Sequence, residues 1–444
     1  MTASLFTFDW DAEATDSIAS KELAATLARI EIGANGRFAT IAEDLQNGSI
    51  RRSVNVPLYP LAEWIVFNWW ELAFGARSDR TLNGSRQTGG TERRARVHNL
   101  RSAGDGFCWP DMLIAPEGGM VRLEWHADRE VLAGRGIRFV TDGVEWVTPE
   151  WVRDSFTSVV ESVLVRLDEG GVGETPLHKE WAALRELDPD EVEFCQACGR
   201  LGLDPFSEGI DLARQIEGVF SSLDPSIVWD FYDAANPLQL EHNASWVEDA
   251  DRAGRALLQG TGRSAALSDL QAAAAGGDWS QLSRPWEVGY AQARALRESL
   301  GLGPTQPVST DLLPIAVDHL ESGEPSLQGL VRTGEDRAAL VMGWSASEAA
   351  RRFAAARALW HAVSDVQGQV SLLTAGTSRG QQTARAFAAE FLAPAEGIRS
   401  VLGGAGATTV APMVADRFRV AETVIEHQME NQLTRAGRDG WARL

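Results

Sequence analysis

The first part of the chain combines short strand-like runs with one long apolar run of helical period. Over residues 38–56 the strand-like runs are interrupted by Asn47-Gly48, a dipeptide typical of tight turns. Residues 57–74 are strongly apolar, and their tryptophan and phenylalanine side chains recur at helical spacing. This stretch therefore predicts two or more short strands followed by a helix.

The next stretch alternates between apolar and polar residues. Over residues 112–148 turns are expected at Gly118-Gly119 and at Asp142-Gly143, which predicts a β-meander or a pair of hairpins. A proline then opens a run, residues 149–167, with apolar side chains at helical spacing, and this predicts a long helix. Residues 1–170 are accordingly expected to form an α+β domain.

The middle of the chain is helical in pattern. A glycine-rich run over residues 169–173 is typical of a linker, and residues 180–283 show helical spacing. The predicted helices are separated by three prolines, Pro189, Pro205 and Pro225. These features predict a helical domain over residues 171–284.

The last third of the chain changes pattern again. Helix-like runs are expected over residues 286–300 and 310–322, and strand-like runs over residues 326–332 and 338–344. A long helix then opens near Ser347. Residues 285–444 therefore predict a mostly helical domain with a small sheet, and the whole chain predicts a multidomain α+β protein.

Charge narrows the range of partners. The formal net charge is −21, so most of the surface should repel polyanions, whose binding needs clustered Lys and Arg. No stretch approaches 18 apolar residues, and the first ten residues lack the basic start and apolar run of a secretory signal. These observations predict a cytoplasmic protein that does not bind membranes.

Two helix-like segments in the last third carry the most informative residues. The first contains Arg352-Phe353 and continues to His361. The second contains Phe387-Ala388-Ala389 and closes with Leu392-Ala393-Pro394. This arrangement resembles the ImmA/IrrE family of metallopeptidases, in which an Arg-Phe pair leads into a helix with His-Glu-x-x-His. The resemblance implies a zincin-like fold for residues 285–444.

The resemblance also implies where a zinc site would lie. Two His at i and i+4 share one helix face and hold zinc, while the Glu activates a zinc-bound water. Here Arg357 stands at the first His, Ala358 at the Glu and His361 at the second His; Gln381 stands at the third ligand, one turn before Arg385 at the family's usual Asn. A guanidinium has no free lone pair for a metal, and an amide is a weak zinc ligand. We therefore expect a degenerate site without cofactor.

A function follows from the resemblance. Active members of the family cleave helix-turn-helix repressors, often in stress responses or in switches of phages and mobile elements. The resemblance with a degenerate site implies a catalytically inactive regulatory or protein-interaction protein of bacterial stress, phage defence or a mobile-element switch. Its expected partner is another protein, such as a helix-turn-helix regulator or a component of a toxin system.

The same residues are also compatible with other functional roles. An active zinc metallopeptidase with altered ligands would use His361 with Glu390 or Asp365. Arg357 would alternatively bind a carboxylate or phosphate where the family holds zinc. A surviving, packed histidine is the simpler expectation for His361.

One basic block stands out in this acidic protein. Seven arginines face only two acidic residues in a segment rich in Gly, Ser and Thr; they are Arg77, Arg80, Arg86, Arg93, Arg94, Arg96 and Arg101. A solvated loop is one interpretation, and a site for an acidic partner, a nucleotide or a nucleic-acid backbone is the other. DNA-binding regulation through this block is therefore an alternative function.

Two short motifs point to other chemistry. Gly376-Thr377-Ser378-Arg379-Gly380 matches the Gly-x-Ser-x-Gly elbow of serine hydrolases, but 42 glycines make a chance match unremarkable. Cys195 and Cys198 have the spacing of a zinc or redox pair, yet no second pair accompanies them. We expect both motifs to be structural.

Overall fold

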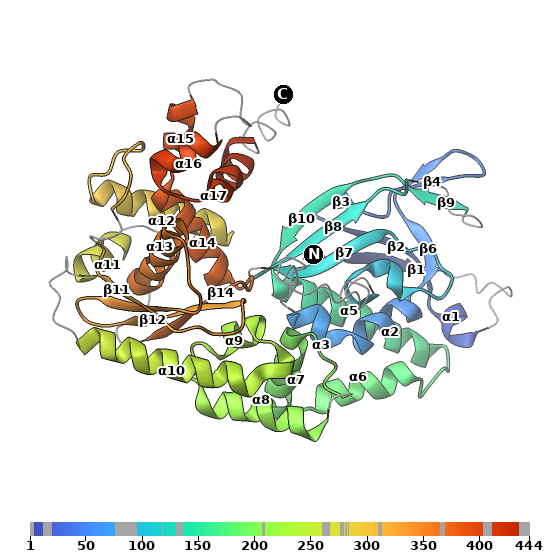
Figure 1. The fold of residues 1–444 in the computed structure, drawn as a ribbon. Coiled ribbons are helices and arrows are strands. Elements are labelled where there is room, and N and C mark those ends of the chain that lie inside the picture. The colour runs from blue at the N-terminus through green and yellow to red at the C-terminus, as the bar shows by residue number, and fades with distance from the viewer. Residues whose placement is uncertain are drawn as a thin grey trace. The chain divides into compact units, whose positions relative to one another are not determined.

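The computed structural model describes residues 4–11, 20–75, 96–117, 119–129, 136–206, 209–259, 267–275, 279, 282, 284–309, 313–364, 369–402 and 411–434. The chain forms two compact units, Met1–Ala213 and Arg214–Leu444. Each unit combines helices with small sheets, so the expected α+β class is confirmed (Figure 1). None of the described helices is long and apolar enough to cross a membrane.

The described residues of the first unit form three small antiparallel sheets. In the first, β2 pairs with β1, β3 and β6; in the second, the order is β10-β8-β7; in the third, it is β5-β4-β9. The bounds are β1 Phe6–Trp10, β2 Leu27–Ala34, β3 Arg37–Phe38, β4 Ala42–Asp44, β5 Ile50–Arg51, β6 Val54–Pro57, β7 Asp111–Glu117, β8 Met120–His126, β9 Ile137–Phe139 and β10 Gly143–Val147.

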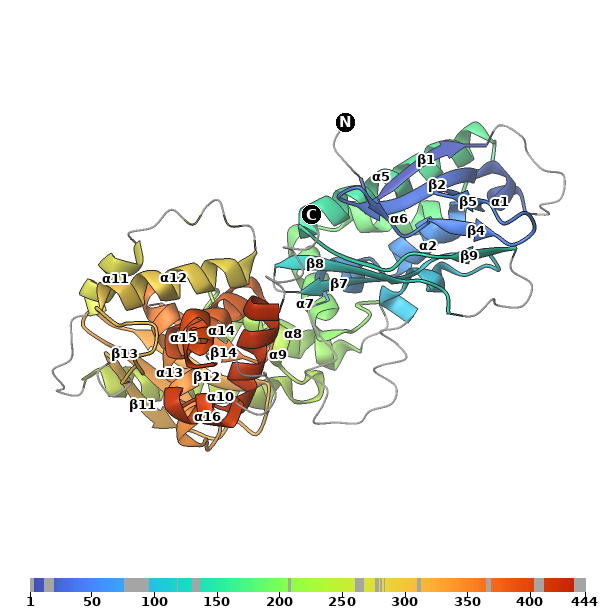
Figure 2. The same ribbon diagram turned by 90° about the horizontal axis from the view of Figure 1, so that it is seen from above.

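Helices cover one side of these strands (Figure 2). They are α1 Lys21–Ala25, α2 Tyr59–Phe67, α3 Trp69–Phe74, α5 Pro149–Glu169, α6 Pro176–Glu186 and α7 Pro189–Leu201, with a 3-10 turn at Leu100–Ala103. Helix α5 begins where Thr148 caps the backbone N–H of Trp151, and its buried side chains repeat at helical spacing. Side chains such as Phe156, Trp125 and Ile30 are fully or almost fully buried and form one core.

Several predictions for this unit hold, and two are wrong in detail. The hairpin at Gly119 exists as β7–β8, and the long helix exists as α5. The predicted helix over residues 57–74 is divided at Asn68 into α2 and α3. The strands on either side of Asp142-Gly143 do not form a hairpin, because β9 pairs with β4 and β10 pairs with β8. Alternation predicts a strand but not its partner.

The second unit is built on one four-stranded sheet of order β11-β13-β12-β14. Its strands are β11 Ile315–His319, β12 Leu327–Thr333, β13 Ala338–Met342 and β14 Val370–Thr374. Strand β11 runs parallel to β13, and the other pairs are antiparallel. The predicted helix over residues 310–322 is wrong, since its described part forms β11; the run is short enough that neighbouring strands decide its conformation.

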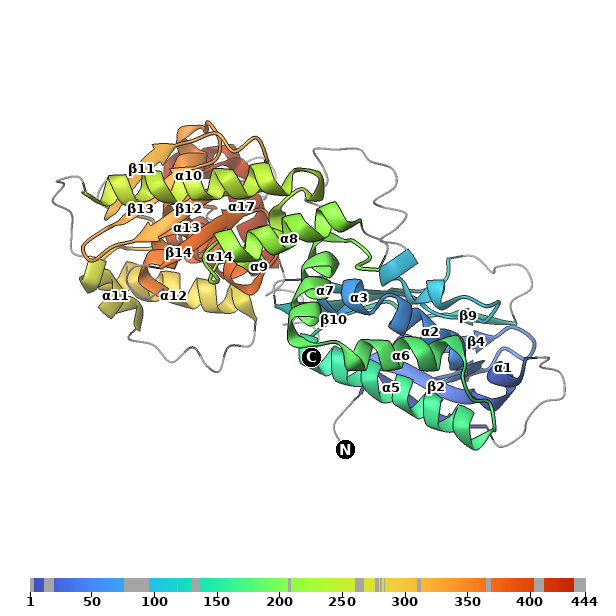
Figure 3. The same ribbon diagram turned by 90° about the horizontal axis from the view of Figure 1, so that it is seen from below.

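Helices cover both faces of this sheet. The helices are α8 Ile210–Ser222, which begins before the unit boundary, α9 Val228–Ala234, α10 Leu240–Gln259, α11 Leu267–Ala275, α12 Pro285–Ser299, α13 Glu348–Ser364, α14 Arg379–Leu392, α15 Ala395–Leu402, α16 Ala411–Phe418 and α17 Glu422–Gln428, with a 3-10 turn at Pro237–Gln239 and a π-helical turn at Met429–Thr434. Helix α10 follows one face, and α13 and α14 lie on the other (Figure 3).

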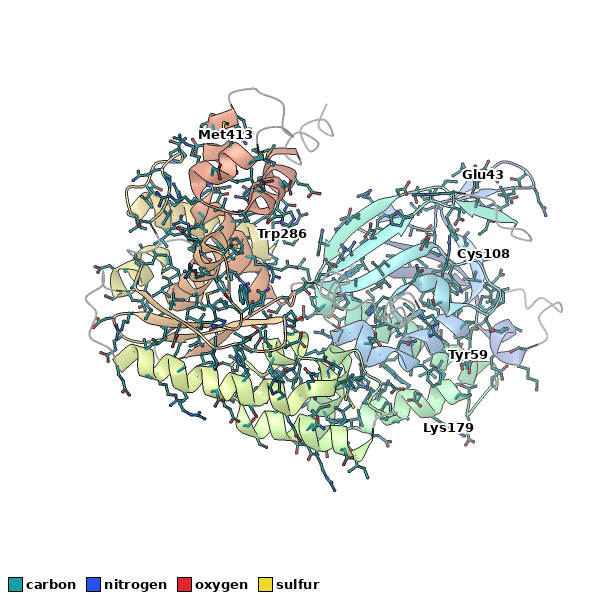
Figure 4. All side chains as sticks on the ribbon, in the orientation of Figure 1. Glu43, Tyr59, Cys108, Lys179, Trp286 and Met413 are labelled. Carbon is teal, nitrogen blue, oxygen red and sulfur yellow. The ribbon has the colours of Figure 1, made fainter. Side chains whose placement is uncertain are left out.

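Side chains pack between the sheet and the helices of the second unit (Figure 4). Phe387 and Phe391 stack with ring centroids 5.3 Å apart in a core shared by α12, α13 and α14. A smaller apolar cluster joins α13 to the sheet through Ala358, Leu340 and Leu373. The predicted long helices near residues 347 and 381 are confirmed as α13 and α14.

The helices expected over residues 171–284 fall in both compact units, α6 and α7 in the first and α9 to α11 in the second. The division into domains 1–170, 171–284 and 285–444 stays a prediction, because compactness does not establish which segments fold independently.

Candidate functional site

Four elements of the second unit meet around two of the expected site residues, Arg357 and Gln381. Helices α13 and α14 supply Arg357 and Gln381, and strands β12 and β14 supply Gln328 and Thr374. Ser378 caps the start of α14 by accepting a hydrogen bond from the N–H of Gln381, which places Gln381 in the first turn, beside the end of β14.

Arg357 is buried at the centre of this group, with 3% of its surface exposed. Its guanidinium donates to Gln328 Oε1 at 2.5 Å, to Gln381 Oε1 at 2.6 Å and to the carbonyl oxygen of Thr374 at 2.9 Å. The three acceptors come from β12, α14 and β14. Arg357 therefore cross-links three elements through one planar group, which a lysine could not do in this geometry.

Gln381 is fully buried and uses both ends of its amide. Its Oε1 also accepts from the N–H of Thr374 at 3.0 Å, and its Nε2 donates to the carbonyl oxygen of Leu372 at 2.5 Å and to Asp230 Oδ2 at 2.8 Å. Because Asp230 lies on α9, the network extends to a third helix. The Arg357 network is hereafter the set Arg357, Gln328, Thr374, Gln381 and Asp230.

A second arginine lies beside the Arg357 network. Arg385 donates to the carbonyl oxygens of Thr374 at 3.1 Å and Gly376 at 2.6 Å. Desolvation lowers the pKa of Arg385 to about 10, although the Asp230 carboxylate opposes this shift. Desolvation, and then the like charge of Arg385, also lower the pKa of Arg357 well below its ordinary value. The environment thus opposes a further positive charge.

These side chains also seal an edge of the sheet. Strand β14 is the last strand in the sheet order, and Val370, Leu372 and Thr374 direct their backbone groups away from β12. Ser226 Oγ donates to the carbonyl oxygen of Val370 at 3.1 Å, Gln381 bonds Leu372 and Thr374, and both arginines bond Thr374. An edge strand ordinarily offers such groups to an added chain, and here side chains occupy the three carbonyl oxygens and the N–H of Thr374.

The other two positions of the segment that resembles His-Glu-x-x-His, Ala358 and His361, are buried in different surroundings. Ala358 is fully buried and belongs to the apolar cluster with Leu340 and Leu373. His361 is 5% exposed, and its ring meets the edge of Trp360 with centroids 4.8 Å apart. A side chain at position 358 therefore packs on the sheet, and His361 lies in a packed aromatic environment.

Glu390, the alternative zinc ligand, is committed elsewhere. Its carboxylate is 1% exposed and accepts from Arg294 Nε at 2.7 Å, Gln428 Nε2 at 2.8 Å, Gln432 Nε2 at 2.7 Å and the N–H of Ala395 at 3.2 Å. These donors join α12 and the C-terminal helices to α14, a structural role. Asp365, the other alternative, lies outside the described residues.

The residues at the expected zinc positions do not fit zinc. A tetrahedral site needs imidazole, thiolate or carboxylate ligands converging on one point. Here a guanidinium occupies that place, and the amide oxygen of Gln381 is already used by Arg357 and Thr374. Among the described residues no group of three or more His, Cys, Asp or Glu side chains could hold a metal ion.

The basic block is described only in part. Arg77, Arg80, Arg86, Arg93 and Arg94 lie outside the described residues. Arg96 is exposed, and its carbonyl oxygen accepts from Trp64 Nε1 at 3.2 Å. Arg101 forms ion pairs with Asp128 and, at 3.6 Å, with Asp111. At the described end of the block, the charge of Arg101 is therefore compensated by two carboxylates from later in the chain.

The two short motifs have structural roles in the described parts of the chain. Ser378 is the N-cap of α14, and the sheet before it is mainly antiparallel, unlike the parallel sheet of a serine hydrolase elbow. Cys195 and Cys198 are buried on α7 as free thiols, and burial raises the pKa of Cys195 to about 11. A reactive thiol needs a lowered pKa.

Sequence reasoning missed three members of the Arg357 network, namely Gln328, Thr374 and Asp230. Asp230 lies 151 residues before Gln381 in the chain and carries no motif. A buried arginine needs acceptors, so the substitution at position 357 does signal that partners exist. It does not indicate which residues supply them.

Comparisons of the chain with protein-family models, with curated proteins and with solved structures found no match.

Proposed function

We propose that this chain is a cytoplasmic regulatory or protein-interaction protein whose second unit is a catalytically inactive, ImmA/IrrE-like metallopeptidase scaffold. The observation that carries the proposal is the Arg357 network. Arg357 and Gln381, which stand at two metal-ligand positions of the resembling family, bond directly to each other at 2.6 Å. The guanidinium of Arg357 places a covalently attached cation where the resembling family binds a zinc ion. The oxygens that it contacts belong to amides and are uncharged.

Two further features support an inactive scaffold. The position of the general base is Ala358, which is buried among aliphatic side chains and has no group that accepts a proton. The outer edge of β14 is occupied by Ser226, Gln381, Arg357 and Arg385. A peptide therefore finds neither a base nor an open strand there. With a net charge of −21, a protein partner suits this chain better than a nucleic acid.

Restoring the lost ligands tests the scaffold. We expect the triple variant Arg357→His, Ala358→Glu, Gln381→Glu to bind about one zinc per chain, because imidazoles at positions 357 and 361, one helical turn apart, and a carboxylate at position 381 supply three ligands. The unchanged full chain should contain no stoichiometric zinc. Metal content is measured by plasma mass spectrometry after dialysis. As the matched control, adding His361→Ala to the triple variant should remove the zinc.

Two outcomes contradict the proposal. A folded triple variant, with native circular dichroism, that binds no zinc rejects the metallopeptidase-like scaffold. Stoichiometric zinc in the unchanged chain, lost on the single substitution His361→Ala, shows instead that an active site of altered ligands exists. This second measurement does not require the triple variant to fold.

The regulatory role is tested with helix-turn-helix regulators or toxin-system components encoded beside this chain. We expect the full chain to co-purify with one of these partners. We also expect the mass of that partner to stay unchanged after prolonged incubation with the chain and zinc. A partner shortened at a defined peptide bond only when the chain is present would contradict an inactive scaffold. Absence of binding to any neighbouring product would contradict the interaction role.

A further inference from the structure

The first unit contains an open strand edge beside a groove. Strand β1 pairs with β2 alone among the strands of the described residues. The N–H of Asp11 bonds to Leu27 and the carbonyl of Leu5 bonds to Gly33, so in this antiparallel pair the alternate residues Phe6, Phe8 and Trp10 direct their backbone groups away from β2. In contrast to β14, this edge offers a template for an added strand.

Helix α5 follows β1 along its length (Figure 2). At one end the N–H of Leu5 donates to Ser155 Oγ at 3.1 Å, and the rings of Phe6 and Phe156 stack at 6.2 Å. At the other end the guanidinium of Arg166 lies over the ring of Trp10 at 5.7 Å. The strand and the exposed flank of α5 therefore run side by side over about 16 Å.

A groove of about 600 Å³ lies on this flank. It is lined by Trp10 and by α5 residues that include Val165, which is 57% exposed, and three carboxylates, Asp154, Glu161 and Glu169. The one cation of the lining, Arg166, is already engaged: its Nε donates to the carbonyl oxygen of Ala25, and its Nη1 lies 3.6 Å from Glu169. The groove thus has an excess of negative charge next to an exposed apolar surface.

We propose that the edge of β1 and the α5 groove bind an extended, basic peptide segment of a partner protein by strand addition. The backbone of the peptide would pair with Phe6, Phe8 and Trp10, and its alternate side chains would enter the groove. The three carboxylates follow one another at about 10–12 Å along α5. Lysines at positions i and i+4 of a strand lie about 13 Å apart, so they reach two neighbouring carboxylates.

The groove lies wholly in the first unit and is independent of the Arg357 network, so failure of either proposal leaves the other standing. The segment proposed to bind here is extended and basic, and measurements of zinc content do not test its binding.

The test uses a fluorescein-labelled eleven-residue peptide of alternating Lys and Val and the full-length chain, with binding followed by fluorescence anisotropy at low salt. We expect the double variant Asp154→Asn, Glu161→Gln to weaken binding about tenfold. The matched control, Glu186→Gln with Glu193→Gln, changes the net charge equally at exposed positions of α6 and α7 and should leave binding within about twofold.

The peptide backbone supplies the second arm of the test. The same peptide with alternate backbone nitrogens methylated keeps its charges but loses one row of hydrogen-bond donors, and it should bind at least about tenfold more weakly. Equal weakening by the two double variants would show attraction to overall charge only and would overturn the site. Unchanged binding of the methylated peptide would overturn strand addition. No binding of the unmodified peptide would overturn both.

Discussion

At the scale of single residues, the second unit uses arginine as a structural cross-link. Arg297, Arg352 and Arg357 are 3–5% exposed. Arg297 donates to the carbonyl oxygens of Phe391, Gly303 and Gln306, and Arg352 to those of Arg419 and Val308. A guanidinium has five donors in a fixed plane, so one side chain satisfies carbonyls from several segments. Arg357 belongs to this pattern, which explains how a cation is accommodated in the interior.

The three cysteines differ in burial and should therefore differ in reactivity. Cys195 and Cys198 are buried on α7, whereas Cys108 is partly exposed. With a pKa near 11, about one Cys195 thiol in a thousand is ionised at pH 8, and the thiolate is the reactive form. We expect a disulfide reagent to modify Cys108 in the native chain and all three cysteines after unfolding. Rapid native modification of Cys195, located by peptide mass analysis, would contradict its burial.

At the scale of elements, the close contact between α12 and α14 aligns the helix that carries Gln381. This contact depends on Gly289, where a β-carbon would lie 2.4 Å from the carbonyl oxygen of Thr383 and 2.8 Å from the backbone nitrogen of Phe387. Both atoms belong to backbone and cannot rotate away. The absence of a side chain at position 289 therefore sets how closely α12 approaches α14.

We expect Gly289→Ala to destabilise the second unit by about 2 kcal/mol, because the new methyl group overpacks the α12–α14 contact. Gly218 on α8 is the matched control, since it is exposed and a β-carbon there meets nothing within 4 Å. Gly218→Ala should stabilise the second unit by about 0.5–1 kcal/mol through helix propensity. Urea titrations followed by circular dichroism measure both changes. Equal effects of the two substitutions would reject the close approach.

At the scale of the whole molecule, the two compact units have separate cores. One cluster, which includes Phe156, lies in Met1–Ala213, and another, which includes Phe391, lies in Arg214–Leu444. Both side chains are fully buried. Separate cores predict that the units unfold in separable transitions, so a single two-state free energy would not describe this chain.

Scanning calorimetry of the full chain tests this expectation. Phe156→Ala and Phe391→Ala each remove a buried ring, at a cost of about 3–5 kcal/mol. We expect each substitution to lower the Tm of a different transition by roughly 10 °C and to leave the other within about 2 °C. One transition that shifts equally with both substitutions would show a single cooperative unit.

The periodicity of the sequence predicted the elements with strong local patterns. Helix α5 lies where apolar spacing placed it, because it buries one face along its length. Helix α13 and strands β12 and β13 also lie where long apolar runs placed them, although α13 and β13 are buried on more than one face. The same reasoning failed where the pattern was short. The described part of residues 310–322 is β11, and the runs beside Asp142-Gly143 pair with strands elsewhere, because partners distant in sequence decide both cases.

By itself, the sequence determined the chemical types available at the candidate site: a cation at position 357, a methyl group at 358 and an amide at 381. Tertiary structure alone decided what these groups do, because acceptors from β12, β14 and α14 surround the cation only after the sheet has formed. The contrast between the sealed edge of β14 and the open edge of β1 also arises only in three dimensions. Strand order and the neighbouring helices determine whether backbone groups at an edge are satisfied, and neither can be read from the residues of the strand itself.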